Sequence, residues 1–112
     1  LLHLFYPDKG NFIGVVSNMS SRGLKSEFRD LMAKSKINVR SIAAPAGLVG
    51  VDFSDHLNYW KFGYDAIMIT DTAFYRNKNY HQATDTIETL DFSKMADAIE
   101  GVFYGVLNLA CR

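Results

Sequence analysis

Short β-branched runs that alternate with helical patterns constrain the fold of this chain most strongly. Three apolar runs, at 11–17, 39–43 and 66–70, have the length and composition of buried strands. Strands that alternate with helices in this way form an α/β layer with at least some parallel pairing. The run 66–70 is apolar on both faces, which predicts a sheet that is covered by helices on both sides.

Helical patterns fill the stretches between and after these runs. The first helix follows Ser20 or Ser21, either of which can cap it, and its apolar stripe consists of Leu24, Phe28, Leu31 and Met32. A short helix is expected over 55–62. The last helix begins at Asp91 or Ser93. Its one apolar face is expected to hold Met95, Ile99, Val102, Phe103, Val106 and Ala110.

The segment 71–91 is polar, rich in turn-forming residues and without any regular period. We therefore expect a long loop, and long loops inside compact domains are usually functional or disordered. The whole pattern predicts a single α/β domain over 1–112. Three layers, helix, sheet and helix, would surround a narrow, mostly parallel or mixed sheet of about three strands.

Composition excludes several classes of protein. The 112 residues carry 12 Lys and Arg against 12 Asp and Glu, so the net charge is zero. That balance argues against a general nucleic-acid binder, and no apolar run approaches the roughly 18 residues that a membrane-inserted helix needs. The one cysteine, Cys111, rules out an internal disulfide and a cysteine-based zinc site. No signal peptide is visible, and the compartment stays open.

Histidines near carboxylates are the candidates for chemistry. Asp55 and His56 head the short helix, and His81 lies in the long loop, four residues before Asp85 and Thr86. An imidazole near carboxylates in a loop after a strand suits a metal ligand or a general base. Each residue also has an ordinary structural interpretation: a solvated histidine, a helix cap, and turn formers. The residues alone leave both interpretations open.

A family resemblance favours the metal interpretation. It is carried by four segments: Ser54-Asp-His-Leu-Asn-Tyr-Trp60, Gly63-Tyr-Asp-Ala-Ile-Met-Ile-Thr-Asp-Thr-Ala-Phe-Tyr-Arg-Asn77, Tyr80-His81 and Asp85-Thr-Ile-Glu-Thr-Leu-Asp91. They resemble the C-terminal part of the co-catalytic zinc aminopeptidases, the metallopeptidase family that also includes the glutaminyl cyclases. The match covers about residues 50–100 and keeps order, spacing and several uncommon residues.

The resemblance implies roles for individual residues. Members of the family hold two zinc ions, which share a bridging carboxylate and a water, at the C-terminal edge of a mixed sheet. His81 matches the last metal ligand in sequence, and Asp55 matches an aspartate that supports the site without binding metal. Asp85 and Thr86 would hold the loop, whereas His56 is given no chemistry.

Three further loop residues are expected at the substrate entrance. Tyr75, Arg76 and Tyr80 would line it, although exposed loop aromatics are often simply packed against the loop. Peptide would be the substrate of the parent enzyme. We expect no nucleic-acid partner and no membrane insertion.

The resemblance also predicts an incomplete site. The family's remaining ligands (a His, the bridging Asp, a Glu and a further Asp) and its general-base Glu precede the matched region. The 112 residues are therefore expected to be the C-terminal fragment of a larger peptidase domain, inactive alone, because zinc sites need three or four protein ligands. A narrow sheet has two open edges, so we expect the fragment to form a homo-oligomer through them.

Two alternatives stay open. The chain could be a non-catalytic α/β module that associates through its sheet edges. Glutaminyl-cyclase activity is a neighbouring possibility, ranked lower because 70–74 resembles the peptidases more.

Overall fold

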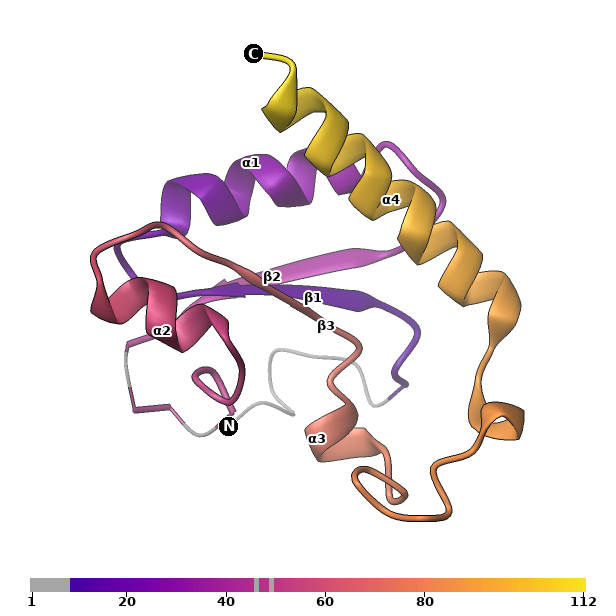
Figure 1. Cartoon of the computed structure of the whole chain (residues 1–112). Coiled ribbons are helices and arrows are strands. Elements are labelled where there is room, and N and C mark those ends of the chain that lie inside the picture. Colours follow the sequence, from indigo (N-terminus) through magenta and orange to yellow (C-terminus); the bar gives the residue numbers. More distant parts are fainter. Residues whose placement is uncertain (1–8, 46, 49) are drawn as a thin grey trace.

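The computed structural model describes residues 9–45, 47–48 and 50–112, and it shows a small sheet with helices on both faces (Figure 1). Strand β1 (Ile13–Ser17) lies at the centre of the sheet, in the order β2-β1-β3. It pairs in parallel with β2 (Val39–Ala43) and antiparallel with β3 (Met68–Thr70). The expected α/β class is confirmed, and the sheet is mixed.

The direction of β3 decides where its following loop begins. Helix α1 (Arg22–Met32) connects β1 to β2, as a parallel pair requires, and Ile13 lies opposite Val39. On the other edge Gly14 lies opposite Thr70. The carboxyl end of β3 is therefore beside the amino end of β1. The loops after β2 and β3 start from opposite ends of the sheet, whereas an all-parallel sheet would bring them to one edge.

The alternating side chains of β1 belong to two separate cores. Val15 packs with Phe28 and Met32 of α1, and the inner side of helix α4 (Phe92–Ala110) covers this core. Val16 packs on the other face with Ala44 and Val51. Helix α2 (His56–Lys61) contributes only Trp60 to the second core.

Ser21, one of the two predicted residues, stands at the N-cap position of α1, but its side chain makes no capping bond. The Ser21 hydroxyl donates to Asp65 Oδ1 (3.1 Å) and accepts from the Ala66 amide (3.2 Å), which ties α1 to the segment before β3. The amide oxygen of Asn18 instead accepts bonds from the Ser21 amide (2.9 Å) and the Ser20 hydroxyl (3.0 Å). The predicted cap position is therefore confirmed at Ser21, whereas the capping hydrogen bond is absent because the buried hydroxyl makes a long-range contact.

Helix α4 buries a different face from the one predicted. Gly105 is buried against α1, and a Cβ there would lie 2.6 Å from the Phe28 ring, so only glycine allows this close approach. The partly buried residues on this side are Ala98, Val102 and Leu109. Apart from Val102, the predicted face is exposed, and its members are Met95, Ile99, Phe103, Val106 and Ala110. The predicted residues other than Val102 thus share an exposed face, because the glycine side of α4 packs more closely on α1.

The segment 71–91 is more ordered than a plain loop. It contains helix α3 (Ala73–Arg76) and the 3₁₀ helix η2 (Ile87–Thr89). The Asp71 carboxylate accepts a hydrogen bond from the Ala73 amide (2.8 Å) at the start of α3. At the end of the segment, Asp91 caps α4 by accepting a bond from the Lys94 amide (3.0 Å), as expected for one of its two candidates. Within the described ranges, no helix is long and apolar enough to cross a membrane.

Candidate active site

Two adjoining hollows lie on the sheet face that α1 and α4 do not cover. The larger, of about 1070 Å³, reaches the sheet at Val16, Ile42 and Met68. The smaller, of about 480 Å³, is lined by Asp52, Phe53, Ser54, Asp55, Phe74, Tyr80 and His81. Four of these seven also line the larger hollow. The loops after β2 and β3 therefore meet over this face, and the hollows form one continuous candidate site.

Asp55 and His81, which are distant in the sequence, both line the smaller hollow. Asp55 stands immediately before α2, but its carboxylate accepts no bond from the amides of that helix. The side chain of Asp55 therefore does not cap α2, although the sequence allowed that role. Asp52 lines the same hollow and was missed, although its position three residues before Asp55 is visible in the sequence.

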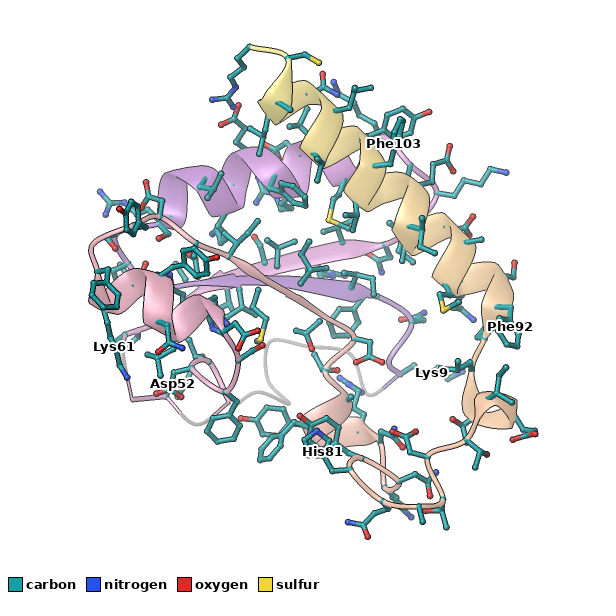
Figure 2. The ribbon with its side chains drawn as sticks, viewed as in Figure 1. Lys9, Asp52, Lys61, His81, Phe92 and Phe103 are labelled. Carbon is teal, nitrogen blue, oxygen red and sulfur yellow. The ribbon has the colours of Figure 1, made fainter. Side chains whose placement is uncertain are left out.

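His81 lies in a tight turn with an uncommon backbone conformation. The Gln82 amide donates to the Asn79 carbonyl (2.8 Å), and His81 has a φ of 56°, a left-handed value that histidine tolerates better than most residues. Its ring stacks on Tyr80 with centroids 4.2 Å apart and planes inclined by 16°. Figure 2 shows His81 beside α3, on the far side of the molecule from Phe103. Such backbone conformations concentrate at functional sites.

An aromatic cluster forms one wall of the site. The Phe74 ring makes edge-to-face contacts with Phe53 (4.9 Å), Tyr75 (5.0 Å) and Tyr80 (6.0 Å). Rings in this arrangement support one another and leave apolar faces for a ligand. Phe53 was missed from the sequence. It is 54% exposed, and no periodicity could have distinguished it from a loop residue.

The three residues expected at the substrate entrance all line the larger hollow. Arg76 is also held from two sides, because its Nε donates to Thr72 Oγ1 (2.9 Å) and its guanidinium lies 5.4 Å from the Phe12 ring centroid. Tyr75 and Tyr80 contact Phe74 as described above. Their contact with substrate stays a prediction.

Asp85 and Thr86 make contacts within the loop. The Asn77 side chain donates to Asp85 Oδ1 (3.1 Å). The Thr86 carbonyl accepts from the Thr89 hydroxyl (2.7 Å). Two hydrogen bonds lower the pKa of the Glu88 carboxyl. The larger effect comes from the Thr86 side chain, and the smaller comes from the backbone amide of Glu88 itself. These contacts are compatible with the loop-holding role, which stays a prediction.

His56 lies apart from the hollows. It is buried, its Nε2 lies 2.5 Å from the Val51 carbonyl oxygen, and its ring meets Trp60 edge to face at 4.5 Å. This histidine connects α2 to the segment before it, and the sequence analysis assigns it no chemistry.

The donor set does not fit a complete zinc site. His81 is a suitable zinc ligand, and Asp52 and Asp55 bring carboxylates to the same hollow. Among residues 9–45, 47–48 and 50–112, however, no three His, Cys, Asp or Glu side chains converge closely enough to hold a metal ion. Because zinc needs three or four protein ligands, the described residues supply at most part of a site.

Comparison with known proteins decides the family. The profile of peptidase family M28 matches residues 4–106, most of the chain. This chain belongs to peptidase family M28. The resemblance drawn from residues 50–100 is confirmed, and the M28 match extends it towards both ends of the chain.

A relative of this chain is much longer than the chain itself. The uncharacterized protein YfbL of Escherichia coli (strain K12) is 46% identical over 98 residues, which are 87% of this chain and 30% of the relative. The chain thus spans less than a third of that relative's length. No solved structure matches this chain.

Proposed function

We propose that this chain is part of a zinc-dependent aminopeptidase, to which it contributes one metal ligand and one wall of the substrate site. The observation that carries the proposal is the meeting of His81 and Asp55 in a hollow lined by aromatic rings. Membership of peptidase family M28 supports the peptidase class. The zinc and the preference for peptide N-termini come from the resemblance of the site segments.

The residues of the hollow divide the work by their chemistry. His81 offers a ring nitrogen in a turn that holds its imidazole at the rim, stacked on Tyr80. Asp55 offers a carboxylate that its own helix does not use, so it can orient a neighbouring donor. The rings around Phe74 would bind the apolar part of a peptide and exclude water. The remaining ligands and a general base would come from residues outside this set.

The experiment joins the chain to the rest of its longer E. coli relative. The matched segment of the E. coli relative is replaced by this chain, and hydrolysis of aminoacyl p-nitroanilides is measured with zinc and after its removal by a chelator. The unmodified relative is assayed alongside. We expect zinc-dependent release of nitroaniline by the hybrid, and no release by the 112 residues alone.

His81→Asn tests the ligand, because asparagine keeps the left-handed turn but has no imidazole. We expect the hybrid carrying it to lose at least about 100-fold in kcat/KM and in zinc affinity by calorimetry, whereas the adjacent Gln82→Ala changes neither. A hybrid that remains active with His81→Asn contradicts the ligand role.

The hybrid also distinguishes the alternative functions. If it cyclises N-terminal glutamine to pyroglutamate and leaves nitroanilides intact, the glutaminyl-cyclase function replaces the proposed peptidase function. A hybrid with neither activity supports the non-catalytic module.

A further inference from the structure

Helix α3 is too short to hold its own position, yet it carries part of the aromatic wall. A helix of four residues does not repay the cost of nucleation, so its surroundings must fix it. Phe74 meets the Phe53 ring in the loop after β2. Tyr75 covers Gly50 in the same loop, where an added Cβ would lie 2.8 Å from the tyrosine oxygen. The orientation of α3 therefore decides where the wall of the site stands.

The last residue of α3 contacts the segment before β1. The Arg76 guanidinium lies 5.4 Å from the centroid of the Phe12 ring. The stem of the same side chain passes Gly10 so closely that an added Cβ there would lie 3.1 Å from Arg76 Cδ. Arg76 Nε also donates to Thr72 Oγ1 (2.9 Å). Arg76 thus connects the start of α3 to the segment that leads into the central strand.

The residue before α3 has a strained backbone. Thr72 has a φ of 66° and a ψ of 27°, a left-handed conformation that is an outlier for a β-branched residue. Such a conformation persists only where the surrounding contacts over-determine it. The Thr72 hydroxyl accepts the bond from Arg76 and donates to the Asp71 carbonyl. The Thr72 amide donates to Thr70 Oγ1 (2.9 Å). The hydroxyl therefore uses both its donor and its acceptor capacity to hold this bend.

We propose that Thr72 is a positioning residue of the candidate site, and that its hydroxyl holds α3 in the orientation that places Phe74 in the aromatic wall. The Thr72 carbonyl also accepts bonds from the amides of Tyr75 (3.0 Å) and Arg76 (3.2 Å). The bend and the helix thus begin at one residue, and loss of the hydroxyl releases both. The consequence for substrate rests on the proposed function, whereas the consequence for the position of α3 does not.

Variants of Thr72 separate its hydroxyl from its backbone conformation. Thr72→Ser keeps the hydroxyl, and Thr72→Val keeps the shape without it. Thr72→Gly lacks the hydroxyl but adopts a left-handed backbone without strain, so it serves if Thr72→Val does not fold. The matched control is Thr84→Val, at an exposed loop threonine whose hydroxyl makes no hydrogen bond with any described residue.

Nuclear magnetic resonance of the full chain measures the position of α3 without substrate or metal. In the unmodified chain we expect Overhauser effects between the Phe53 and Phe74 rings. We also expect the Arg76 Nε proton to exchange slowly with water, because it is hydrogen-bonded. Thr72→Ser and Thr84→Val should keep both signals. Thr72→Val and Thr72→Gly should lose both, while circular dichroism shows that the chain remains folded.

Two results of this measurement overturn the proposal. If the ring contact survives in Thr72→Gly, the hydroxyl is not what holds α3. If Thr72→Ser loses the contact, the methyl group of Thr72 has the role that we assign to its hydroxyl.

Kinetics of the hybrid with the E. coli relative measure the consequence for substrate. Thr72→Gly should raise the KM for aminoacyl nitroanilides at least about 10-fold and change kcat less than about threefold, because a displaced wall weakens ground-state and transition-state binding alike. Thr72→Ser should keep the KM of the unmodified hybrid. A fall in kcat with KM unchanged contradicts positioning through the wall. An inactive hybrid counts against the proposed function alone, since the resonance measurement still decides the role of Thr72.

Discussion

The two faces of the sheet differ in how they are covered, although the same strand supplies both. On one face, Val15 is closed in by α1 and by the glycine side of α4. On the other, Val16 meets a smaller core, and beside it the sheet opens into the two hollows. The covered face is fixed by close packing, and the open face by turns, caps and aromatic contacts.

Because of this difference, we expect the covered face to determine stability and the open face to carry the candidate chemistry. Interiors packed without voids respond strongly to a change of volume, whereas exposed loop residues tolerate substitution. His81, Asp55 and the aromatic wall lie on the open face, where a ligand can reach them. Substitutions on the covered face should therefore unfold the chain, and substitutions on the open face should leave it folded.

The largest effect is expected from Phe28→Ala. Phe28 is 4% exposed in the covered core, so its loss should cost about 3–5 kcal/mol in the free energy of unfolding. Phe74→Ala, on the open face, should cost less than about 1 kcal/mol, since that ring is 46% exposed. Urea unfolding followed by circular dichroism, at one protein concentration, measures both. Equal losses would remove the contrast between the faces, and Phe28→Leu replaces Phe28→Ala if the latter does not fold.

A smaller effect tests the glycine contact between α4 and α1. Gly105→Ala places a Cβ within 2.6 Å of the Phe28 ring and should cost about 1–3 kcal/mol by overpacking. Gly23→Ala, in α1 with no atom within 4 Å of its added Cβ, should instead stabilise by up to about 1 kcal/mol through helix propensity. Thermal unfolding of the two variants should shift in opposite directions. A stabilising Gly105→Ala would show that the helices separate without cost.

The smallest effect concerns Asp91, where the open-face loop joins α4. A hydrogen bond from the Lys94 side chain, and then one from the Lys94 amide, lowers the pKa of Asp91 below its ordinary 3.8. A carboxyl whose pKa falls on folding stabilises the folded protein at pH values above the ordinary pKa of the group. This contribution disappears as the pH falls through the pKa of the folded state. The melting temperature should therefore drop slightly at acid pH. Asp91→Asn should reduce that drop while keeping the cap, and an unchanged drop would exclude Asp91 as its source.

Sequence patterns predicted the elements better than their contacts. The three strands, α1, α2 and α4 follow from β-branched runs and helical periodicity. Ser21 was predicted as a possible cap of α1, but the absence of its capping bond was not predictable, because only the distant Asp65 and Ala66 bind its hydroxyl. Residues 71–91 have no periodicity, so α3 and η2 were missed.

The candidate site shows the same division. His81 and Asp55 could be named from their neighbours along the chain, and the structure places both in one hollow. Asp52 was missed although it is close to Asp55 in the sequence, and Phe53 could not be named, since nothing in the sequence brings the loop after β2 to the loop after β3. The two loops start from opposite ends of the sheet, and their meeting is a result of how they fold back over its open face.

The sequence by itself determined the α/β class, the peptidase family and the residues suited to chemistry, because these depend on residue type and local spacing. The tertiary structure alone decided which side of α4 is buried. An apolar stripe reports that a helix face avoids water, but the closest approach between helices goes to the smallest side chains. Gly101 and Gly105 therefore lie against α1, and the larger apolar side chains Met95, Ile99 and Phe103 are exposed.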